Sequence, residues 1–249
     1  MNSAILFGMS KQPVPAAIAR IAPDGNLTPP QKRRFMIDMV RRRQKPGTGS
    51  SHEFMRTRTA MHPWPDLRPI LHGIDWVLIG GVATRAYMPE RTTKDMDILV
   101  HHADRDEVIR RLRQAGYSVV SRLTIPGYLL HSPEGVEVDV LFGQYPWLRE
   151  ALKQPVYDQA GYPVIALPYL VLMKLTAQRV QDWADVSRMV GWAADADLDA
   201  VRAVVARYSP EDLEDLVSLI FLGRQEQALP DDAASEAELP SEDDSPSNE

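Results

Sequence analysis

The sequence predicts an α+β fold, in which a small mixed β-sheet is flanked by helices and followed by a helical C-terminal part, with disordered ends. Short runs rich in β-branched residues alternate with helical patterns between residues 63 and 167. Only helical patterns follow, over residues 168–225. Residues 1–30 and 226–249 show no sustained apolar period, which favours disorder at both ends.

Charge is distributed unevenly along the 249 residues, whose formal net charge is −6. Residues 1–60 carry 11 Lys/Arg against 3 Asp/Glu, whereas residues 226–249 carry 9 acids and no base. We interpret residues 1–62 as a basic, largely flexible arm and residues 226–249 as an acidic disordered tail. A basic arm favours contact with nucleic acid, because Lys and Arg neutralise phosphates.

One amphipathic pattern lies in the basic arm, over residues 31–44. Phe35, Met36, Met39 and Val40 recur at helical spacing with six Lys/Arg around them, which predicts a short helix. This helix could bind RNA, dock on the acidic tail or be solvated.

Composition excludes several classes of protein. The chain has no cysteine, so disulfides and thiolate-ligated zinc are excluded. No apolar run approaches the length of about 20 residues that crosses a bilayer. Pro13 and Pro15 close behind a brief apolar patch argue against a signal peptide, whereas a transit peptide stays open. We expect a cytoplasmic protein that has no membrane partner.

The first predicted strand of the sheet, residues 76–79, runs directly into a glycine pair. Residues 67–72 precede it as a short predicted helix. Gly80 and Gly81 let backbone N–H groups approach a ligand without any Cβ in the way. A helix then begins at residues 82–85, and a helix start favours an anion such as phosphate.

Two aspartates share one face of the next predicted strand, residues 92–100. Asp95 and Asp97 alternate with Met96 and Ile98, so the carboxylates face one way and the apolar side chains the other. Carboxylates about 7 Å apart on one strand repel each other unless a cation lies between them. A hard divalent ion is the natural candidate.

The following elements end in a strand with a third aspartate. Residues 104–116 predict a helix with a capping box formed by Asp104 and Glu107 and a stop at Gly116. Strands are predicted at residues 117–123, 128–131 and 136–142, the last two joined by a turn. Asp139 lies within the third of these strands, where a buried carboxylate needs a partner; Glu137 shares its face but is expected to be solvated.

Helices dominate the remainder of the chain. One more short strand is predicted within residues 161–167, and Pro168 starts a helix. Because Arg179 would fall in the apolar stripe of one continuous helix, we predict two helices with a break near residues 180–182 and Asp182 as N-cap. Residues 197–208 and 210–223 predict two further helices.

The order of these motifs resembles a known family. A Gly-Gly pair, an Asp-x-Asp pair that opens a strand and a lone aspartate in a later strand are similar to the DNA polymerase β-like nucleotidyltransferases, most of all the minimal abortive-infection type of toxin–antitoxin systems. The likeness covers about residues 74–190 and makes residues 63–167 the nucleotidyltransferase core.

The resemblance implies a role for each motif. Asp95 and Asp97 match the paired metal ligands, Asp139 the third acid and Gly80-Gly81 the phosphate loop. The implied cofactor is Mg²⁺, with two ions, or Mn²⁺. The implied partners are a nucleoside triphosphate, an acceptor that is RNA (tRNA) or protein, and a cognate antitoxin.

Five further residues are candidate nucleotide ligands. Lys174 and Arg179 are partners for triphosphate or base by charge and by family likeness; the alternative is that they form salt bridges with Asp182 or Asp185. Thr84, Arg85 and Thr93 lie next to the glycine loop or the carboxylates and are candidate phosphate contacts.

These assignments predict a magnesium-dependent enzyme that moves a nucleoside monophosphate from a triphosphate to a hydroxyl acceptor, as a possible toxin. One alternative is a catalytically idle nucleotide- or RNA-binding module on the same fold. Another is an enzyme that modifies a small molecule such as an antibiotic. For an RNA acceptor, we expect salt-sensitive binding that weakens when residues 1–60 are deleted, whereas a small-molecule enzyme would not need them.

Overall fold

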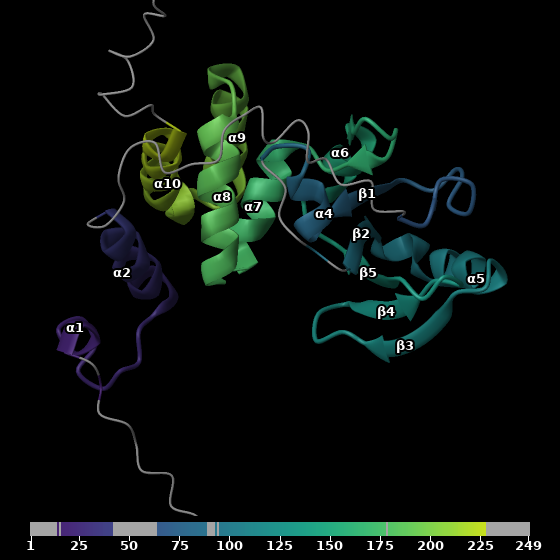
Figure 1. Cartoon of the computed structure of the whole chain (residues 1–249), viewed down its shortest axis with the longest axis horizontal. Helices are drawn as coiled ribbons and strands as arrows, with labels where there is room; N and C mark the ends of the chain where they lie inside the picture. Colours follow the sequence, from purple (N-terminus) through teal and green to yellow (C-terminus); the bar gives the residue numbers. More distant parts are fainter. Residues whose placement is uncertain are drawn as a thin grey trace, which may run out of the picture. The chain divides into compact units, whose positions relative to one another are not determined.

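The computed structural model describes residue 14 and residues 16–41, 64–88, 93, 95–177 and 179–227 (Figure 1). The chain divides into two units, Met1–Arg42 and Arg43–Glu249. The predicted disordered tail at residues 226–249 was wrong for residues 226 and 227, which end a helix. Residues 228–249 and most of the predicted arm lie outside the described residues.

The described residues of the first unit form two helices, α1 (Ala16–Ala19) and α2 (Pro29–Arg41). Residues 1–30 were predicted to be disordered, which is wrong for the residues of α1. Helix α2 is the predicted basic helix, but it begins before residue 31 because Thr28 caps it. The Thr28 amide and hydroxyl both donate to Gln31 Oε1, at 2.8 and 2.9 Å, in the manner of a capping box. Pro29 and Pro30 then occupy the first turn, where a missing N–H costs nothing.

A mixed β-sheet forms the first half of the second unit. Within the described residues it has seven strands in the order β3-β4-β5-β2-β1-β7-β6. The strands are β1 (Trp76–Ile79), β2 (Asp95–His101), β3 (Ser118–Arg122), β4 (Gly127–His131), β5 (Glu137–Gly143), β6 (Val156–Tyr157) and β7 (Pro163–Val164). Strand β6, which has only two residues, was not predicted, because so short a run carries no period.

Three strands at the centre of this sheet position the acidic residues. Strand β2 pairs antiparallel with β1 and parallel with β5. The register places Asp97 opposite Ile79 on one side and opposite Asp139 on the other. The predicted face of each strand is confirmed, since Met96 and Ile98 are fully buried while Asp97 and Asp139 are only partly so.

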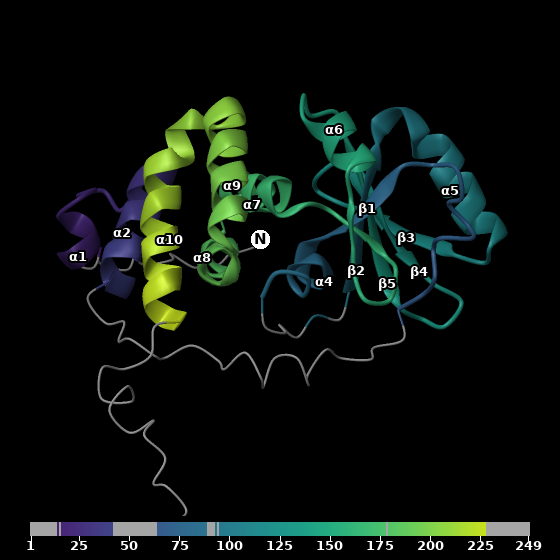
Figure 2. The same cartoon turned by 90° about the horizontal axis from the view of Figure 1, so that it is seen from above.

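Helix α5 (Arg105–Gln114) lies along the sheet in both views (Figures 1 and 2). Its buried residues are Val108, Ile109 and Leu112. The helix ends as predicted at Gly116, whose φ is +90°. The amides of Gly116 and Tyr117 donate back to the carbonyls of Arg113 and Leu112, which is a Schellman motif.

The second half of the unit is helical, as predicted (Figure 2). It comprises α7 (Leu167–Ala177), α8 (Val180–Trp192), α9 (Asp195–Tyr208), a 3₁₀ turn at Pro210–Asp212 and α10 (Leu213–Gln227). Helices α8 and α10 cross at Gly191 and Gly223, where a Cβ on Gly223 would lie 2.0 Å from the Ser187 carbonyl oxygen. This close crossing packs α8 directly against α10.

Three local predictions were wrong. Residues 67–72 form turns rather than a helix, with a single helical hydrogen bond from the Leu71 amide to the Leu67 carbonyl. The capping box of Asp104 and Glu107 is absent: a 3₁₀ turn at His102–Asp104 precedes α5, and Asp104 makes no side-chain cap. Glu107 instead accepts hydrogen bonds from Arg110 and Arg111, one turn further along its own helix.

The predicted break in the C-terminal helical segment exists, but its cap was wrong. Helix α8 begins at Val180 with Arg179 in the N-cap position, and Asp182 lies inside its first turn. The Asp182 carboxylate is buried and bound to cations rather than to backbone amides. Asp182 therefore forms ion pairs instead of capping the helix.

The α+β fold with a mixed sheet, flanking helices and a helical C-terminal part is confirmed. Across the described residues, no helix combines the length and the apolarity needed to span a bilayer.

Candidate active site

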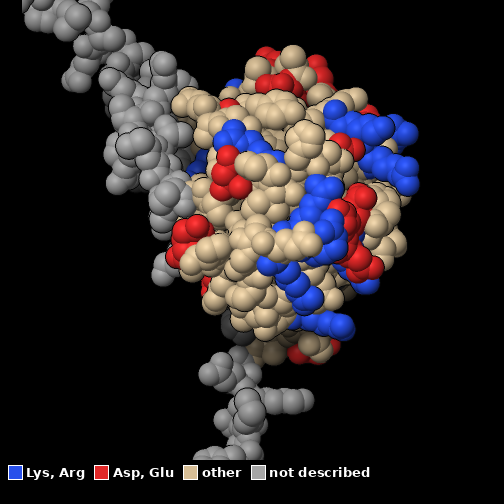
Figure 3. Space-filling view, turned by 90° about the vertical axis from the view of Figure 1, so that its right-hand side faces the viewer, with Lys and Arg blue, Asp and Glu red and all other residues tan. Residues whose placement is uncertain are grey.

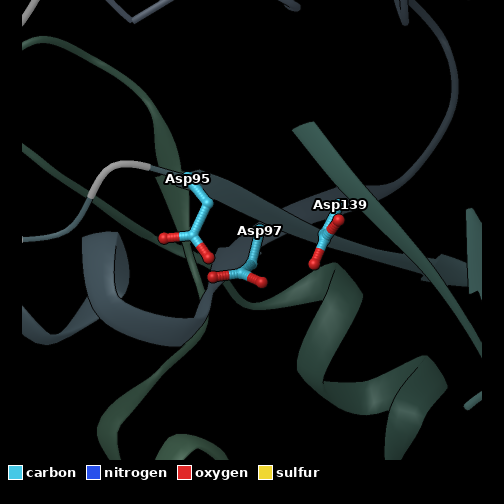
Figure 4. A group of neighbouring side chains, drawn as sticks. All are labelled: Asp95, Asp97 and Asp139. Atoms are coloured by element: carbon cyan, nitrogen blue, oxygen red, sulfur yellow. The ribbon is translucent and has the colours of Figure 1, made fainter. Parts of the chain in front are cut away.

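Three carboxylates meet where β2 and β5 run side by side. Asp95, Asp97 and Asp139 each offer an oxygen atom, and these atoms all lie within 4.8 Å of one another. Figure 4 shows Asp97 between the other two, with all three carboxylates on the same side of the strands. The parallel register of Asp97 with Asp139 joins residues that are far apart in the sequence. The predicted aspartates are thus brought together.

The glycine pair packs directly against this acidic cluster. Helix α4 (Gly80–Thr84) starts where β1 ends, and Gly80 has a φ of +64°. A Cβ on Gly80 would lie 1.9 Å from Asp97 Oδ2, so glycine is required both by backbone conformation and by space. A Cβ on Gly81 would lie 2.9 Å from Thr93 Oγ1. The backbone at Gly80 therefore lies so close to the Asp97 carboxylate that no side chain fits between them.

Burial and mutual repulsion disfavour the ionised form of the clustered carboxylates. Burial, then the charges of Asp95 and Asp139, raise the pKa of Asp97 to about 7. The Gly81 amide and the charge of Lys174 oppose this shift without cancelling it. Burial, Asp95 and Glu137 also raise the pKa of Asp139. The protein thus holds carboxylates close together without enough positive charge of its own.

This arrangement fits a divalent metal ion. The ligand atoms are all carboxylate oxygens, which hard cations such as Mg²⁺ prefer. Asp139 Oδ1 is buried and has no hydrogen-bond partner among the described residues, so one acceptor in the cluster is left unsatisfied. A cation would supply that partner and remove the repulsion that raises the pKa of Asp97.

A cleft of about 730 Å³ opens beside two of the three aspartates, Asp97 and Asp139. Helix α7 and the start of α8 line one side of it, and the turn after β3 and the segment after β5 line another. Much of its surface is apolar, from Leu141, Leu170 and Met173 among others. The cleft combines an acidic end with walls suited to flat or apolar groups.

Lys174 forms the centre of a buried ion cluster at the edge of this cleft. Its Nζ lies 3.0 Å from Asp182 Oδ1 and 2.7 Å from Asp185 Oδ2, and all three residues are buried. Arg179 Nε lies 2.6 Å from Asp182 Oδ2, while the Arg179 side chain is 75% exposed. The salt-bridge alternative for Lys174 and Arg179 is therefore realised, and both residues still line the cleft.

The three other candidate phosphate ligands have structural contacts of their own. The Thr84 hydroxyl is fully buried and donates to the Gly81 carbonyl at 2.7 Å, which braces the glycine turn. The Arg85 guanidinium lies over the Trp64 ring, 5.6 Å from its centroid. The Thr93 hydroxyl donates to Asp95 Oδ1 and so orients that carboxylate. The contact of Thr93 is with a carboxylate of the acidic cluster itself.

Stacked aromatic rings in the cleft wall were not predicted as part of the site. The Tyr145 and Trp147 rings stack with centroids 4.9 Å apart and planes inclined by 4°, and Tyr145 is 49% exposed. Trp147 stacks in turn on Tyr169 of α7, at 5.6 Å. The sequence signal is faint, since only their position just after the Asp139 strand relates these rings to the site. A half-exposed ring next to carboxylates offers a surface on which a base could stack.

No protein-family model and no curated protein matches this chain. Among solved structures, ANT(2")-Ia in complex with adenylyl-2"-tobramycin is 16% identical, with a TM-score of 0.35, over 60% of this chain and 87% of that one. The lincosamide antibiotic adenylyltransferase LnuA is 12% identical, with a TM-score of 0.32, over 63% and 97%. Terminal uridylyl transferase 4 from Trypanosoma brucei is 13% identical, with a TM-score of 0.27, over 80% and 70%.

Asp97→Asn should stabilise the metal-free protein at pH 8. Because the pKa of Asp97 is about 7 in the fold against 3.8 for a free carboxyl, its ionisation removes stability as the pH rises from about 4 to about 7. The difference between these two pKa values sets a ceiling of roughly 4 kcal/mol on the gain in the free energy of unfolding, and the gain should vanish near pH 4.

Thermal unfolding at pH 4 and pH 8, with and without Mg²⁺, measures this effect. Mg²⁺ should stabilise the wild type at pH 8 and leave Asp97→Asn unchanged. Glu134→Gln is the control, since Glu134 is exposed in the turn before β5 and its charge raises the pKa of neither Asp97 nor Asp139. Equal melting temperatures of wild type and Asp97→Asn at pH 8 without metal would show that repulsion does not strain the cluster.

Gly80→Ala should abolish stabilisation by Mg²⁺. The new Cβ would need the space of the Asp97 carboxylate, and the left-handed backbone would cost about 1–2 kcal/mol of stability. Gly73→Ala is the control, because Gly73 has a φ of +80° but nothing within 4 Å of its Cβ position. Both variants should lose stability in denaturant titrations, Gly80→Ala by more because its Cβ also meets the Asp97 carboxylate. Retained Mg²⁺ stabilisation in Gly80→Ala would contradict the close packing of Gly80 on Asp97.

Proposed function

We propose that this protein is a magnesium-dependent nucleotidyltransferase, which transfers a nucleoside monophosphate from a nucleoside triphosphate to a hydroxyl group. The observation that supports this most is the meeting of Asp95, Asp97 and Asp139 beside a glycine turn, at the end of a cleft large enough for a nucleotide. We assign the metal site to these three carboxylates, with Mg²⁺ as the ion and Mn²⁺ as a substitute.

Bound metal ions would supply charge neutralisation at the phosphates and hold the attacking and leaving oxygens in line. In the proposed reaction, an acceptor hydroxyl forms a new bond to the α-phosphorus, the bond to the β-phosphate oxygen breaks, and diphosphate leaves. We assign the hydroxyl proton to Asp139, because its pKa is raised and its Oδ1 has no hydrogen bond among the described residues.

We assign the triphosphate to the glycine turn and to Arg179. The N-cap residue of α4 makes no side-chain hydrogen bond, and the Gly81 amide already donates to Asp97, so we assign the phosphates to the other amides of this turn. Arg179 is exposed at the cleft and shares Asp182 with Lys174, which leaves part of its guanidinium facing solvent. Lys174 is held by two aspartates, so we assign it to fixing α8 beside α7 rather than to direct phosphate contact. Thr84 supports the turn, and Thr93 orients Asp95.

Two further proposals differ in the class of molecule that accepts the nucleotide. A nucleic-acid or protein acceptor, with a toxin role and a cognate antitoxin, is the finer hypothesis that follows from the family resemblance. A small-molecule acceptor is favoured by one specific observation, the apolar and aromatic walls of the cleft around Tyr145 and Met173. An idle binding module on the same fold is the third possibility, and it predicts nucleotide binding without turnover.

Incubation with each labelled nucleoside triphosphate, Mg²⁺ and either total RNA, a cell lysate or a panel of hydroxylated small molecules tests the reaction. We expect label on one class of acceptor with release of diphosphate. Asp97→Asn should remove the transfer and Asp139→Asn should slow it by about 100-fold or more, because general-base assistance contributes about that much. Glu134→Gln, at an exposed carboxylate that raises the pKa of neither Asp97 nor Asp139, should behave as the wild type. Full transfer by Asp97→Asn, or no transfer to any class by the wild type, would refute the proposed reaction.

A further inference from the structure

A groove with no part in the proposed chemistry runs over the face that carries α5. It consists of two adjoining hollows of about 560 and 330 Å³ that share Arg122 and Tyr128. Helix α5 lines one side of each, and β3, β4 and the turn between them line the other. We call this surface the α5 groove.

The α5 groove is basic although the whole chain carries a net charge of −6. Arg105, Arg110, Arg113 and Arg122 line it, against a single acid, Asp106. Figure 3 shows several groups of Lys and Arg on this side of the molecule, with acidic side chains between them. A local excess of positive charge on a net negative protein calls for an anionic ligand.

Two of these arginines are not neutralised by the protein. Arg105 pairs with Asp106, and Arg110 pairs with Glu107. By contrast, neither Arg113 nor Arg122 has an acidic partner among the residues that the structure describes. Arg122 lies over the Tyr128 ring instead, 5.9 Å from its centroid. Arg113 and Arg122 are therefore the residues of the groove that attract an anion most strongly.

An aromatic ring between these arginines narrows the ligand class. Tyr128 lines both hollows and is fixed edge-on against Phe142, with ring centroids 5.8 Å apart. Cationic side chains along a groove with an aromatic ring among them are suited to a single-stranded nucleic acid, whose phosphates and bases they contact in turn. An acidic peptide would use the arginines but has no need of the ring.

The α5 groove reaches the catalytic cleft around one turn of the chain. Leu123, Thr124 and Ile125, in the turn between β3 and β4, line both the smaller hollow and the cleft. Ile125 is 53% exposed. The groove lies on the α5 side of the sheet, and Asp139 lies on the other side. A nucleic-acid chain held in the groove can therefore pass over this turn and present its end to Asp139.

We propose that the α5 groove binds the phosphodiester backbone of a single-stranded RNA segment and directs its end into the cleft as the acceptor. The binding stands on the groove alone, whereas the role as acceptor rests on the proposed function. Binding and transfer are therefore measured separately.

The test is binding of a fluorescein-labelled single-stranded RNA of about 20 nucleotides to the full chain, by fluorescence anisotropy over a range of salt concentrations. In the variant Arg113→Gln/Arg122→Gln, the dissociation constant should rise about tenfold or more at about 0.1 M salt. The slope of log K against log salt should fall by roughly 0.7 for each arginine. Tyr128→Ala should weaken binding without changing the slope.

Arg188→Gln/Arg202→Gln is the matched control, since both arginines are exposed and ion-paired on the C-terminal helices, and its binding should equal that of the wild type. If the double variant unfolds, Arg113→Gln alone should still lower the slope by roughly 0.7. Equal binding by test and control variants would overturn the proposal. So would displacement of the RNA by poly-glutamate at equal charge concentration, which would make the groove a site for acidic protein.

Asp97→Asn separates this proposal from the proposed function. Asp97 is not in the α5 groove, so the variant should bind RNA as the wild type does. Normal RNA binding with no label transfer to RNA or to any other class of acceptor by the wild type would refute the reaction and leave the groove. Label transfer to RNA that is unaffected by Arg113→Gln/Arg122→Gln would refute the groove and leave the reaction.

Discussion

The parallel pairing of β2 with β5 forces carboxylates together against their own repulsion. Backbone hydrogen bonds and the buried residues Met96, Ile98 and Val138 fix the register, and a slip by one residue would turn every side chain to the other face. Asp97 and Asp139 cannot separate without breaking that register. The pKa of each is raised because burial and the neighbouring carboxylates disfavour its ionised form. Clustered carboxylates with such unfavourable electrostatic energy are typical of a site that binds a cation.

Much of this site could be predicted because it depends on strand parity and on glycine. Alternation of Asp95 and Asp97 with apolar residues fixes which way the carboxylates face, and Gly80 marks where the backbone must come close. Both are local rules that hold in any tertiary setting. The pairing of β2 with β5 is not local, and only the family likeness suggested that Asp139 would join the other two.

Two of the wrong predictions share a physical cause, which is competition from ion pairs between side chains. Glu107 and Asp182 occupy positions where capping is a reasonable local expectation, but each has a cation within reach that binds its carboxylate more strongly than a backbone amide does. Lys174 is the only charge on α7, a helix that is otherwise apolar and buried almost all round. Its charge has to be compensated inside the protein, and Asp182 and Asp185 do so. Their pairing follows from packing that no short stretch of sequence encodes.

That same pairing shapes how the cleft can bind a polyanion. Lys174 and Arg179 are the cations of the cleft, and both are bound to Asp182, so Asp97 and Asp139 leave the cleft acidic. Without a metal ion, such a cleft repels a triphosphate and a nucleic-acid acceptor alike. Metal binding can correct the charge at the reacting phosphate, but its effect on a long backbone fades within about a Debye length. An extended acceptor therefore needs positive charge elsewhere on the protein, and the α5 groove supplies it at the other end of the turn that borders the cleft.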